Sequence, residues 1–189
     1  MLSIRDNNNT IIIKNSKFIT YIYQVHSMED IKKLLDSIRE QYVDATHVCY
    51  AYILDGNIKC SDDGEPSGTA GMPILEVLKK NDLNHVLCVV IRYFGKIKLG
   101  AGGLVRAYAN SAAECIKENI VTLRNAHYVD IIFGYDNSNL VDKLIRDGII
   151  LDKIYDDKIL YKTIIIDSVI DVLKEYKDIE IIVLDKTYL

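Results

Sequence analysis

The segment VVIRYFGKIKLGAGGLVRAYANSA, residues 89–112, decides how the chain is expected to fold. It opens in an uninterrupted apolar run, which is typical of a buried strand, here expected over residues 85–94. A glycine-rich stretch over residues 95–103 follows and predicts a loop. After it, Leu104 and Tyr108 begin an apolar pattern at helical spacing, so we expect a helix that starts near Gly103.

This loop and its flanks are rich in basic side chains and contain no acid. A glycine-rich turn exposes backbone N–H groups, and the start of a helix adds about half a positive elementary charge. The segment therefore predicts an anion-binding site centred on the amides of residues 100–104, with these candidates: Arg92, Lys98, Gly100, Gly102, Gly103 and Arg106. The other interpretation is that the glycines only permit a tight turn and close packing of the helix on the sheet.

Within this basic set, we expect Arg92 and Arg106 to flank the amides, because a guanidinium matches phosphate oxygens better than an ammonium does. Lys96 and Lys98 are expected to add mainly longer-range attraction. His47 lies in an alternating stretch over residues 46–54 that predicts a strand. Its ring is either a base or anion donor near neutral pH, or a half-buried histidine bonded to the backbone.

A second loop, SDDGEPSGTAGMP over residues 61–73, is acidic and carries hydroxyls at Ser67 and Thr69. In one interpretation Ser67 or Thr69 caps the helix that carries residues 74–79, and the carboxylates of Asp62, Asp63 and Glu65 are simply solvated. In the other, the two loops lie side by side and form a cleft of opposite charges. Such a cleft suits a phosphorylated ligand, a nucleic-acid backbone, or a metal with phosphate; alternatively the loops pair with each other, for example Asp63 with Arg92.

The remaining N-terminal elements follow from periodicity. Residues 10–25 predict two strands around an Asn-Ser turn, and residues 28–41 predict a helix with Ser27 as its N-cap. Residues 127–189 predict the order strand, helix, strand, strand, helix, strand. That order is the ferredoxin-like plan, with two helices on one face of a four-stranded antiparallel sheet. The formal net charge of −4 lies entirely in residues 124–189, which also favours two units.

Composition excludes several classes of protein. The chain has 189 residues, of which 49% are hydrophobic, so it is too apolar to be disordered. Charged residues interrupt each apolar run before it reaches the roughly 18 residues of a membrane helix. The first residues form no apolar signal core, so we expect a cytoplasmic protein without membrane association. The four cysteines form no C-x-x-C pair and are expected to be reduced. We expect no cofactor and assign no metal site.

The two loop segments, with NSKFIT at residues 15–20 and THVCYAY at residues 46–52, closely resemble the signature segments of the YigZ/IMPACT family. The resemblance covers the whole chain and implies an α+β fold. Residues 1–122 are expected to be similar to ribosomal protein S5 domain 2. Residues 127–189 are expected to be similar to the ferredoxin-like fifth domain of elongation factor G. Two positions depart from the family pattern, Lys96 where a second glycine is usual and Met72 where a charged residue is common.

The resemblance implies a regulator of translation or of the stress response that binds RNA, the ribosome or a protein partner through the cleft. The eukaryotic members restrain a kinase with the help of an additional domain that we do not expect here. The alternative is an enzyme, of hydrolase or phosphotransfer type, that acts on a phosphorylated small molecule in the same cleft, with a metal on Asp62, Asp63 or Glu65. We assign no catalytic residue, because the sequence carries no recognisable peptidase motif.

Overall fold

The first of two units, Met1–Thr122, is built on a five-stranded sheet in which every neighbouring pair is antiparallel. A computed structural model describes all residues from 1 to 189. The strand order in this sheet is β2 (Asn7–Ile13), β3 (Ser16–Gln24), β6 (Val86–Tyr93), β4 (His47–Leu54) and β5 (Asn57–Ser61). Strand β6 lies at the centre of the sheet, which agrees with the buried strand that its uninterrupted apolar sequence predicts.

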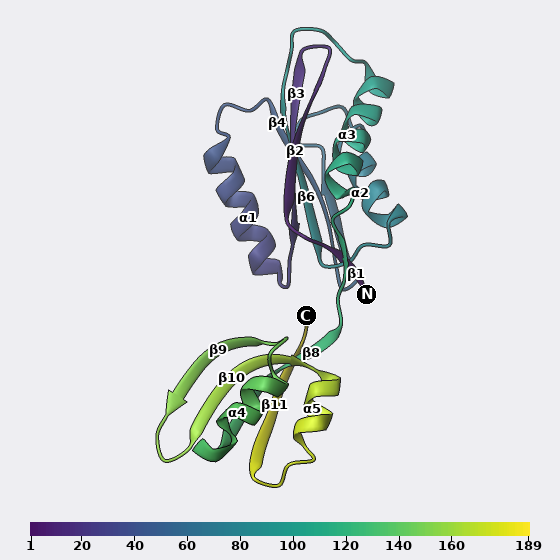
Figure 1. The fold of residues 1–189 in the computed structure, drawn as a ribbon. Coiled ribbons are helices and arrows are strands. Elements are labelled where there is room, and N and C mark those ends of the chain that lie inside the picture. The colour runs from purple at the N-terminus through teal and green to yellow at the C-terminus, as the bar shows by residue number, and fades with distance from the viewer. The chain divides into compact units, whose positions relative to one another are not determined.

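Helices cover both faces of this sheet (Figure 1). Helix α1 (Met28–Gln41) packs on one face through Ile31, Leu35 and Ile38. Helices α2 (Gly71–Lys80) and α3 (Ala101–Ile116) pack on the opposite face. Because both faces are covered, Val86–Arg92 of β6 is buried at every position rather than at alternate ones. A short pair of strands, β1 (Leu2–Ile4) and β7 (Ile120–Thr122), completes the unit.

Local chemistry sets the ends of these elements. Ser27 caps α1 as predicted, and Asp30 completes a capping box by accepting from the Ser27 amide. The turn between β2 and β3 is one residue earlier than expected. Its central residues are Lys14 and Asn15, both with positive φ, whereas Ser16 already belongs to β3. Two consecutive left-handed residues give the turn a twist that matches the flanking strands.

The second unit, Leu123–Leu189, has the expected order of elements. These are β8 (Asn125–Phe133), α4 (Ser138–Leu144), β9 (Ile149–Tyr155), β10 (Ile159–Ile166), α5 (Asp167–Leu173) and β11 (Ile179–Tyr188), with a 3-10 turn at Tyr135–Asn137. The sheet order is β11-β8-β10-β9, and all pairs are antiparallel. Both helices cover one face, and their apolar residues form the core of this unit with that face of the sheet (Figure 1).

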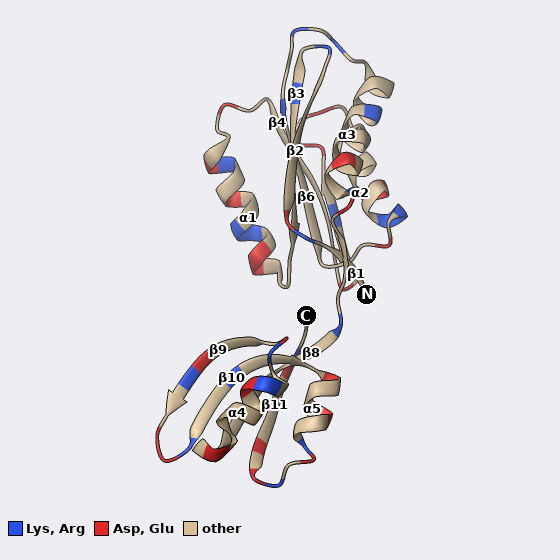
Figure 2. Ribbon diagram, viewed as in Figure 1, with Lys and Arg blue, Asp and Glu red and all other residues tan.

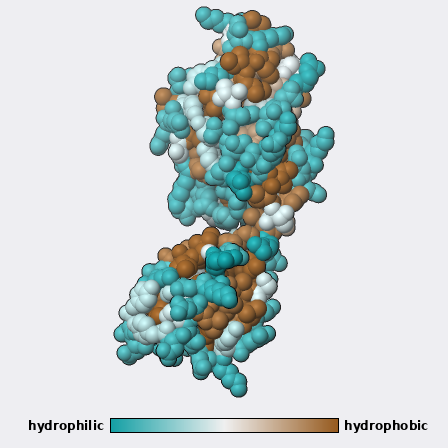
Figure 3. Space-filling model, in the orientation of Figure 1, coloured by the Kyte–Doolittle hydropathy of each residue, from teal (hydrophilic) through white to brown (hydrophobic).

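Edge strand β9 of the second unit is exposed at all seven positions. Its apolar side chains contribute to the hydrophobic surface that Figure 3 shows on this unit, with Leu151 and Tyr155 more than half exposed. Charged Asp152 and Lys153 interrupt the apolar run, which is how natural edge strands limit unwanted pairing. Across the whole chain, no helix combines the length and the apolar character needed to cross a membrane.

The β6–α3 connection depends on one glycine. A Cβ atom on Gly95 would lie 2.0 Å from the backbone carbon of Asn15, so the connection packs directly on the β2–β3 turn. At Gly102, in the first turn of α3, a Cβ atom would meet nothing within 4 Å.

We predict that Gly95→Ala destabilises the protein by more than about 2 kcal/mol, because backbone must move to admit the methyl group. Gly102→Ala is the matched control and should be neutral or stabilising by up to about 1 kcal/mol, since alanine favours helix. Urea denaturation of both variants measures the difference. Equal stability of the two variants would contradict the close approach at Gly95.

Candidate functional site

The acidic loop is held by the carboxylate of Asp62. This carboxylate accepts hydrogen bonds from the backbone amides of Gly68, Ala70 and Gly71, at 2.8, 3.0 and 2.8 Å. Partial burial works to raise the pKa of Asp62, but the three amide bonds outweigh it and lower the pKa below its ordinary value of 3.8. Asp62 therefore caps the start of α2 from eight residues upstream.

This arrangement corrects the expectation that Ser67 or Thr69 caps the helix. The N-cap residue of α2 is Ala70, and no side chain at that position makes a capping bond. Thr69 instead donates its hydroxyl to the carbonyl of Pro66 at 2.6 Å, and Ser67 is exposed. The helix begins at Gly71, three residues before the apolar pattern, because Asp62 satisfies the amides there.

Asp63 binds strand β4 rather than Arg92. Its carboxylate accepts from the Val48 amide at 2.7 Å, and its carbonyl oxygen lies 2.8 Å from Nδ1 of His47. The expected pair between Asp63 and Arg92 is therefore wrong. The reason is one of direction: Asp63 has a positive φ of 44°, and its carboxylate is directed to the β4 backbone.

Glu65 is the partner of Arg92, and the two side chains are buried, with 3% and 6% of their surfaces exposed. Oε1 of Glu65 accepts from Nη1 of Arg92 and from the Tyr108 hydroxyl, the latter at 2.8 Å. Burial, with the neighbouring Cys49 and Glu65, raises the pKa of Tyr108, so its hydroxyl remains a donor. The pair joins the acidic loop to the central strand, and Tyr108 ties it to α3.

Three side-chain atoms, two in this pair and one in the neighbouring His47, keep unused hydrogen-bonding capacity. Oε2 of Glu65 makes no hydrogen bond and lies 3.8 Å from Nε2 of His47. Because the Asp63 carbonyl can only accept, Nδ1 of His47 carries a proton, and in the neutral ring Nε2 is then an acceptor. Nε of Arg92 is buried and has no partner. With the His47 ring neutral, the residues therefore present two adjacent acceptors and one buried donor.

The start of α3 opens beside these groups. Gly100 is its N-cap residue with a φ of 73°, a conformation that glycine adopts readily, and no side chain caps this helix end. The first amides of a helix have no partner within it, so those of Ala101, Gly102 and Gly103 remain available. Figure 2 shows the basic residues of the connection that leads into this helix.

One pocket of about 440 Å³ brings together the buried pair and the start of α3. Residues of both loops line it, so the structure places the two loops side by side. Its polar lining includes one ion pair, one further cation and one histidine, and its walls are otherwise mainly apolar. The lining residues are Thr46, His47, Glu65, Pro66, Arg92, Phe94, Lys98, Leu99, Gly100, Ala101 and Leu104.

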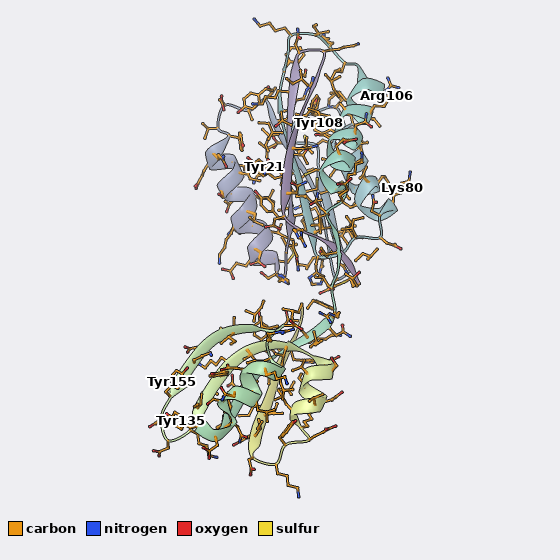
Figure 4. The ribbon with its side chains drawn as sticks, viewed as in Figure 1. Tyr21, Lys80, Arg106, Tyr108, Tyr135 and Tyr155 are labelled. Carbon is orange, nitrogen blue, oxygen red and sulfur yellow. The ribbon has the colours of Figure 1, made fainter.

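Some predicted residues lie elsewhere. Arg106 is exposed on the outer side of α3 and does not line the pocket, whereas Tyr108 of the same helix points to the sheet (Figure 4). Gly102 and Gly103 lie in the first turn of α3 and offer only backbone. Lys96 is outside the lining and has a positive φ of 65°, in agreement with the glycine expected at that position.

Sequence reasoning missed three residues that build this site. Helical spacing places Tyr108 on the buried face of α3 but does not reveal its hydrogen bond to Glu65. Ser16 accepts from the Gly95 amide at 3.1 Å and lies 3.4 Å from Nη2 of Arg92. Thr46 accepts from the Phe94 amide at 3.0 Å and lines the pocket. Only Tyr108 had a usable signal, since a tyrosine on a core-facing stripe needs a partner for its hydroxyl.

The acids of the loop do not fit a metal ion. The carboxylates of Asp62 and Asp63 are taken by backbone amides, and Glu65 is paired with Arg92. No group of three His, Cys, Asp or Glu residues in the chain is arranged to hold a metal. These acids are therefore engaged within the protein and do not form a metal-ligand set.

Comparison with known proteins places this geometry in context. The family described as the Impact N-terminal domain matches residues 14–116. "IMPACT family member YvyE" of Bacillus subtilis (strain 168) is 50% identical over 107 residues, which are 55% of this chain and 49% of that protein. "IMPACT family member YigZ" of Escherichia coli (strain K12) is 38% identical over 111 residues, which are 56% of this chain and 54% of that protein.

The matches thus span about half the length of these curated relatives. A crystal structure of a protein described as hypothetical aligns over 97% of both chains, with a TM-score of 0.62 and 26% sequence identity. The family match includes both loops and the buried pair between Glu65 and Arg92.

We predict that Asp62→Asn lowers the free energy of unfolding by about 1–2 kcal/mol at neutral pH, since the charged acceptor of three amides is lost. The folded-state pKa of Asp62 lies below 3.8, so its contribution is complete above 3.8 and disappears as pH falls through the folded value. Denaturation of both proteins between pH 7 and pH 2 tests this. A difference in stability that persists unchanged at the lowest pH would contradict it.

A second prediction concerns the buried pair. Arg92→Met should destabilise the protein by about 3–5 kcal/mol, because Glu65 is left buried without its cation. Adding Glu65→Gln to that variant should recover part of the loss, because the uncompensated charge is removed while Tyr108 keeps an oxygen acceptor. Urea denaturation of the two variants measures the recovery. A double variant that is less stable than Arg92→Met alone would show that charge pairing is not the dominant contribution.

Proposed function

Because the chain belongs to the YigZ/IMPACT family, we propose that it is a cytoplasmic regulator of translation or of the stress response that binds RNA through the pocket of its first unit. The observation that carries the proposal is the open start of α3 beside Lys98, in a pocket whose single carboxylate is already paired. This combination attracts an anion, and in RNA the anion is phosphate.

The charges of the pocket favour an anionic group. Glu65 and Arg92 neutralise each other, so Lys98 and the positive end of the α3 dipole determine the net sign. Backbone amides at a helix start bind phosphate oxygens directly, and the lysine adds a point charge. Arg92 acts mainly by fixing Glu65, not as a free phosphate clamp.

The net charge of the whole chain favours binding of RNA at one local site over binding along a broad surface. The formal net charge is −4, so nonspecific attraction to an RNA backbone is weak. A partly enclosed pocket that holds one phosphate group fits this balance better than a long basic surface. The pocket volume of about 440 Å³ is in the usual range for small-ligand sites, roughly 300–1,000 Å³.

The fold types implied by the family resemblance are part of the same proposal. The first unit corresponds to residues 1–122 and is proposed to be S5 domain 2-like. The strand arrangement supports this, because β3 and β4 run parallel to each other and β6 lies between them, antiparallel to both. The second is proposed as a ferredoxin-like domain over residues 127–189, similar to domain V of elongation factor G. Its βαββαβ order and antiparallel sheet support that assignment.

One observation favours a second candidate, an enzyme that acts on a phosphorylated small molecule. Nε2 of His47 and Oε2 of Glu65 converge at 3.8 Å in the same pocket as the anion-binding groups. A carboxylate beside a histidine can hold and move a proton during hydrolysis or phosphoryl transfer. Phosphate release from small phosphate esters, abolished by His47→Phe, would support this candidate over a purely binding role.

We predict that Lys98→Ala weakens binding of a single-stranded RNA oligonucleotide several-fold at low salt and reduces the log–log salt slope by about 0.7. Lys59→Ala is the matched control, since Lys59 is exposed on β5 and does not line the pocket. Fluorescence anisotropy across a salt series measures both variants. Identical salt slopes for the wild type and Lys98→Ala would contradict phosphate contact at the pocket.

A further inference from the structure

Two hydrogen-bond acceptors in the same pocket as the start of α3 indicate which ligand group, besides an anion, the pocket would bind. Oε2 of Glu65 and Nε2 of His47 are 3.8 Å apart, and neither has a hydrogen bond within the protein. Two acceptors at this separation both contact an N–H₂ group that lies between them, because such a group has two protons to donate. A carbonyl oxygen in the same position would face two acceptors and be disfavoured.

The charge balance of the Glu65–Arg92 ion pair indicates which kind of amino group the pocket favours. Arg92 neutralises Glu65, so the free oxygen of Glu65 acts as an acceptor within a compensated pair. An ammonium group would add a cation to a pocket that already holds Arg92 and Lys98. A neutral amino group on a heteroaromatic ring donates the same hydrogen bonds without that additional charge.

Apart from the start of α3 with Lys98 and the acceptors of Glu65 and His47, the walls of the pocket are mainly apolar. Phe94 lines the pocket and is 44% exposed, and Leu99 and Leu104 lie with it in the lining. A flat aromatic base packs on such walls, and stacking on an aromatic side chain contributes about 1–3 kcal/mol per base in single-strand binding sites. The pocket therefore offers an anion site, an apolar wall and a pair of acceptors.

We propose that this pocket holds one nucleotide whose base carries an exocyclic amino group, with its phosphate at the start of α3 and its amino group between Glu65 and His47. Cytosine, adenine and guanine carry such a group, whereas uracil and hypoxanthine have a carbonyl oxygen and no exocyclic amino group. The inference deepens the proposed function and rests on it, since it names the nucleotide that the RNA-binding pocket recognises.

The test uses nucleotide pairs that differ at one group. Isothermal titration calorimetry compares cytidine with uridine 5′-monophosphate, and adenosine with inosine 5′-monophosphate. Ribose 5-phosphate serves as the probe without a base. We expect the amino member of each pair to bind about ten-fold more tightly, in line with a specific base contact, and ribose 5-phosphate to bind more weakly than either.

Two variants assign the contacts. His47→Phe keeps a flat ring without nitrogens and should reduce the preference for cytidine over uridine monophosphate to less than two-fold, with little effect on ribose 5-phosphate. Lys98→Ala should weaken all phosphate probes by a similar factor and keep the preference. Arg106→Ala, on the outer side of the same helix, is the control and should change neither.

The outcomes separate this inference from the function on which it rests. If ribose 5-phosphate binds in a Lys98-dependent way but the wild type shows no preference within either pair, the amino-group inference is wrong and the anion site stands. A preference that survives in folded His47→Phe also overturns it. If no phosphate probe binds, both the inference and the anion pocket are refuted. Because the nucleotide pairs are compared on the wild type, the test does not depend on any variant folding.

Discussion

The buried ion pair between Glu65 and Arg92 is the interaction on which the rest of the site depends. It links the acidic loop to the central strand, and Tyr108 extends it to α3. A buried pair of this kind is seldom the most stabilising choice, because both ions lose their hydration. Its value here is positional: it fixes the acidic loop over the end of β6 and so defines one wall of the pocket.

The pair also determines what the pocket attracts. With Glu65 neutralised, the open start of α3 and Lys98 set the sign of the site, so a pocket that borders the acidic loop is proposed to bind an anion. The other acids of the loop are used inside the protein. Asp62 holds the start of α2, and Asp63 holds the start of β4 and orients His47 through its carbonyl. The acidic loop therefore has a mainly structural role, whereas the basic loop supplies the backbone amides and the lysine of the proposed anion site.

The sequence predicted the elements better than the contacts between side chains. Periodicity predicted the central strand, α1 with its Ser27 cap, and the order of elements in the second unit, because these depend on local spacing and burial. It could not decide which of three neighbouring acids pairs with Arg92, since that depends on where the backbone of the loop directs each carboxylate. The same limit explains why Asp62, rather than Ser67 or Thr69, holds the start of α2.

For Arg106, the helical spacing in the sequence already argues against a place in the pocket. Leu104 and Tyr108 were assigned to the buried face of the helix, and a residue midway between them must point away from that face. Helical spacing alone therefore excluded Arg106 from a pocket on the sheet side. The free oxygen of Glu65 beside Nε2 of His47, by contrast, arises only from the three-dimensional fold, because these residues lie on different elements.

The central claim is that the first turn of α3, next to a neutralised Glu65–Arg92 pair, receives an anionic group. Its most direct test is an amide NMR titration of the isotope-labelled protein with inorganic phosphate. The amides of Ala101, Gly102 and Gly103 should show the largest shifts, and they should saturate together. Shifts that are confined to the outer side of α3 or to the second unit, with the first-turn amides unmoved, would contradict the claim.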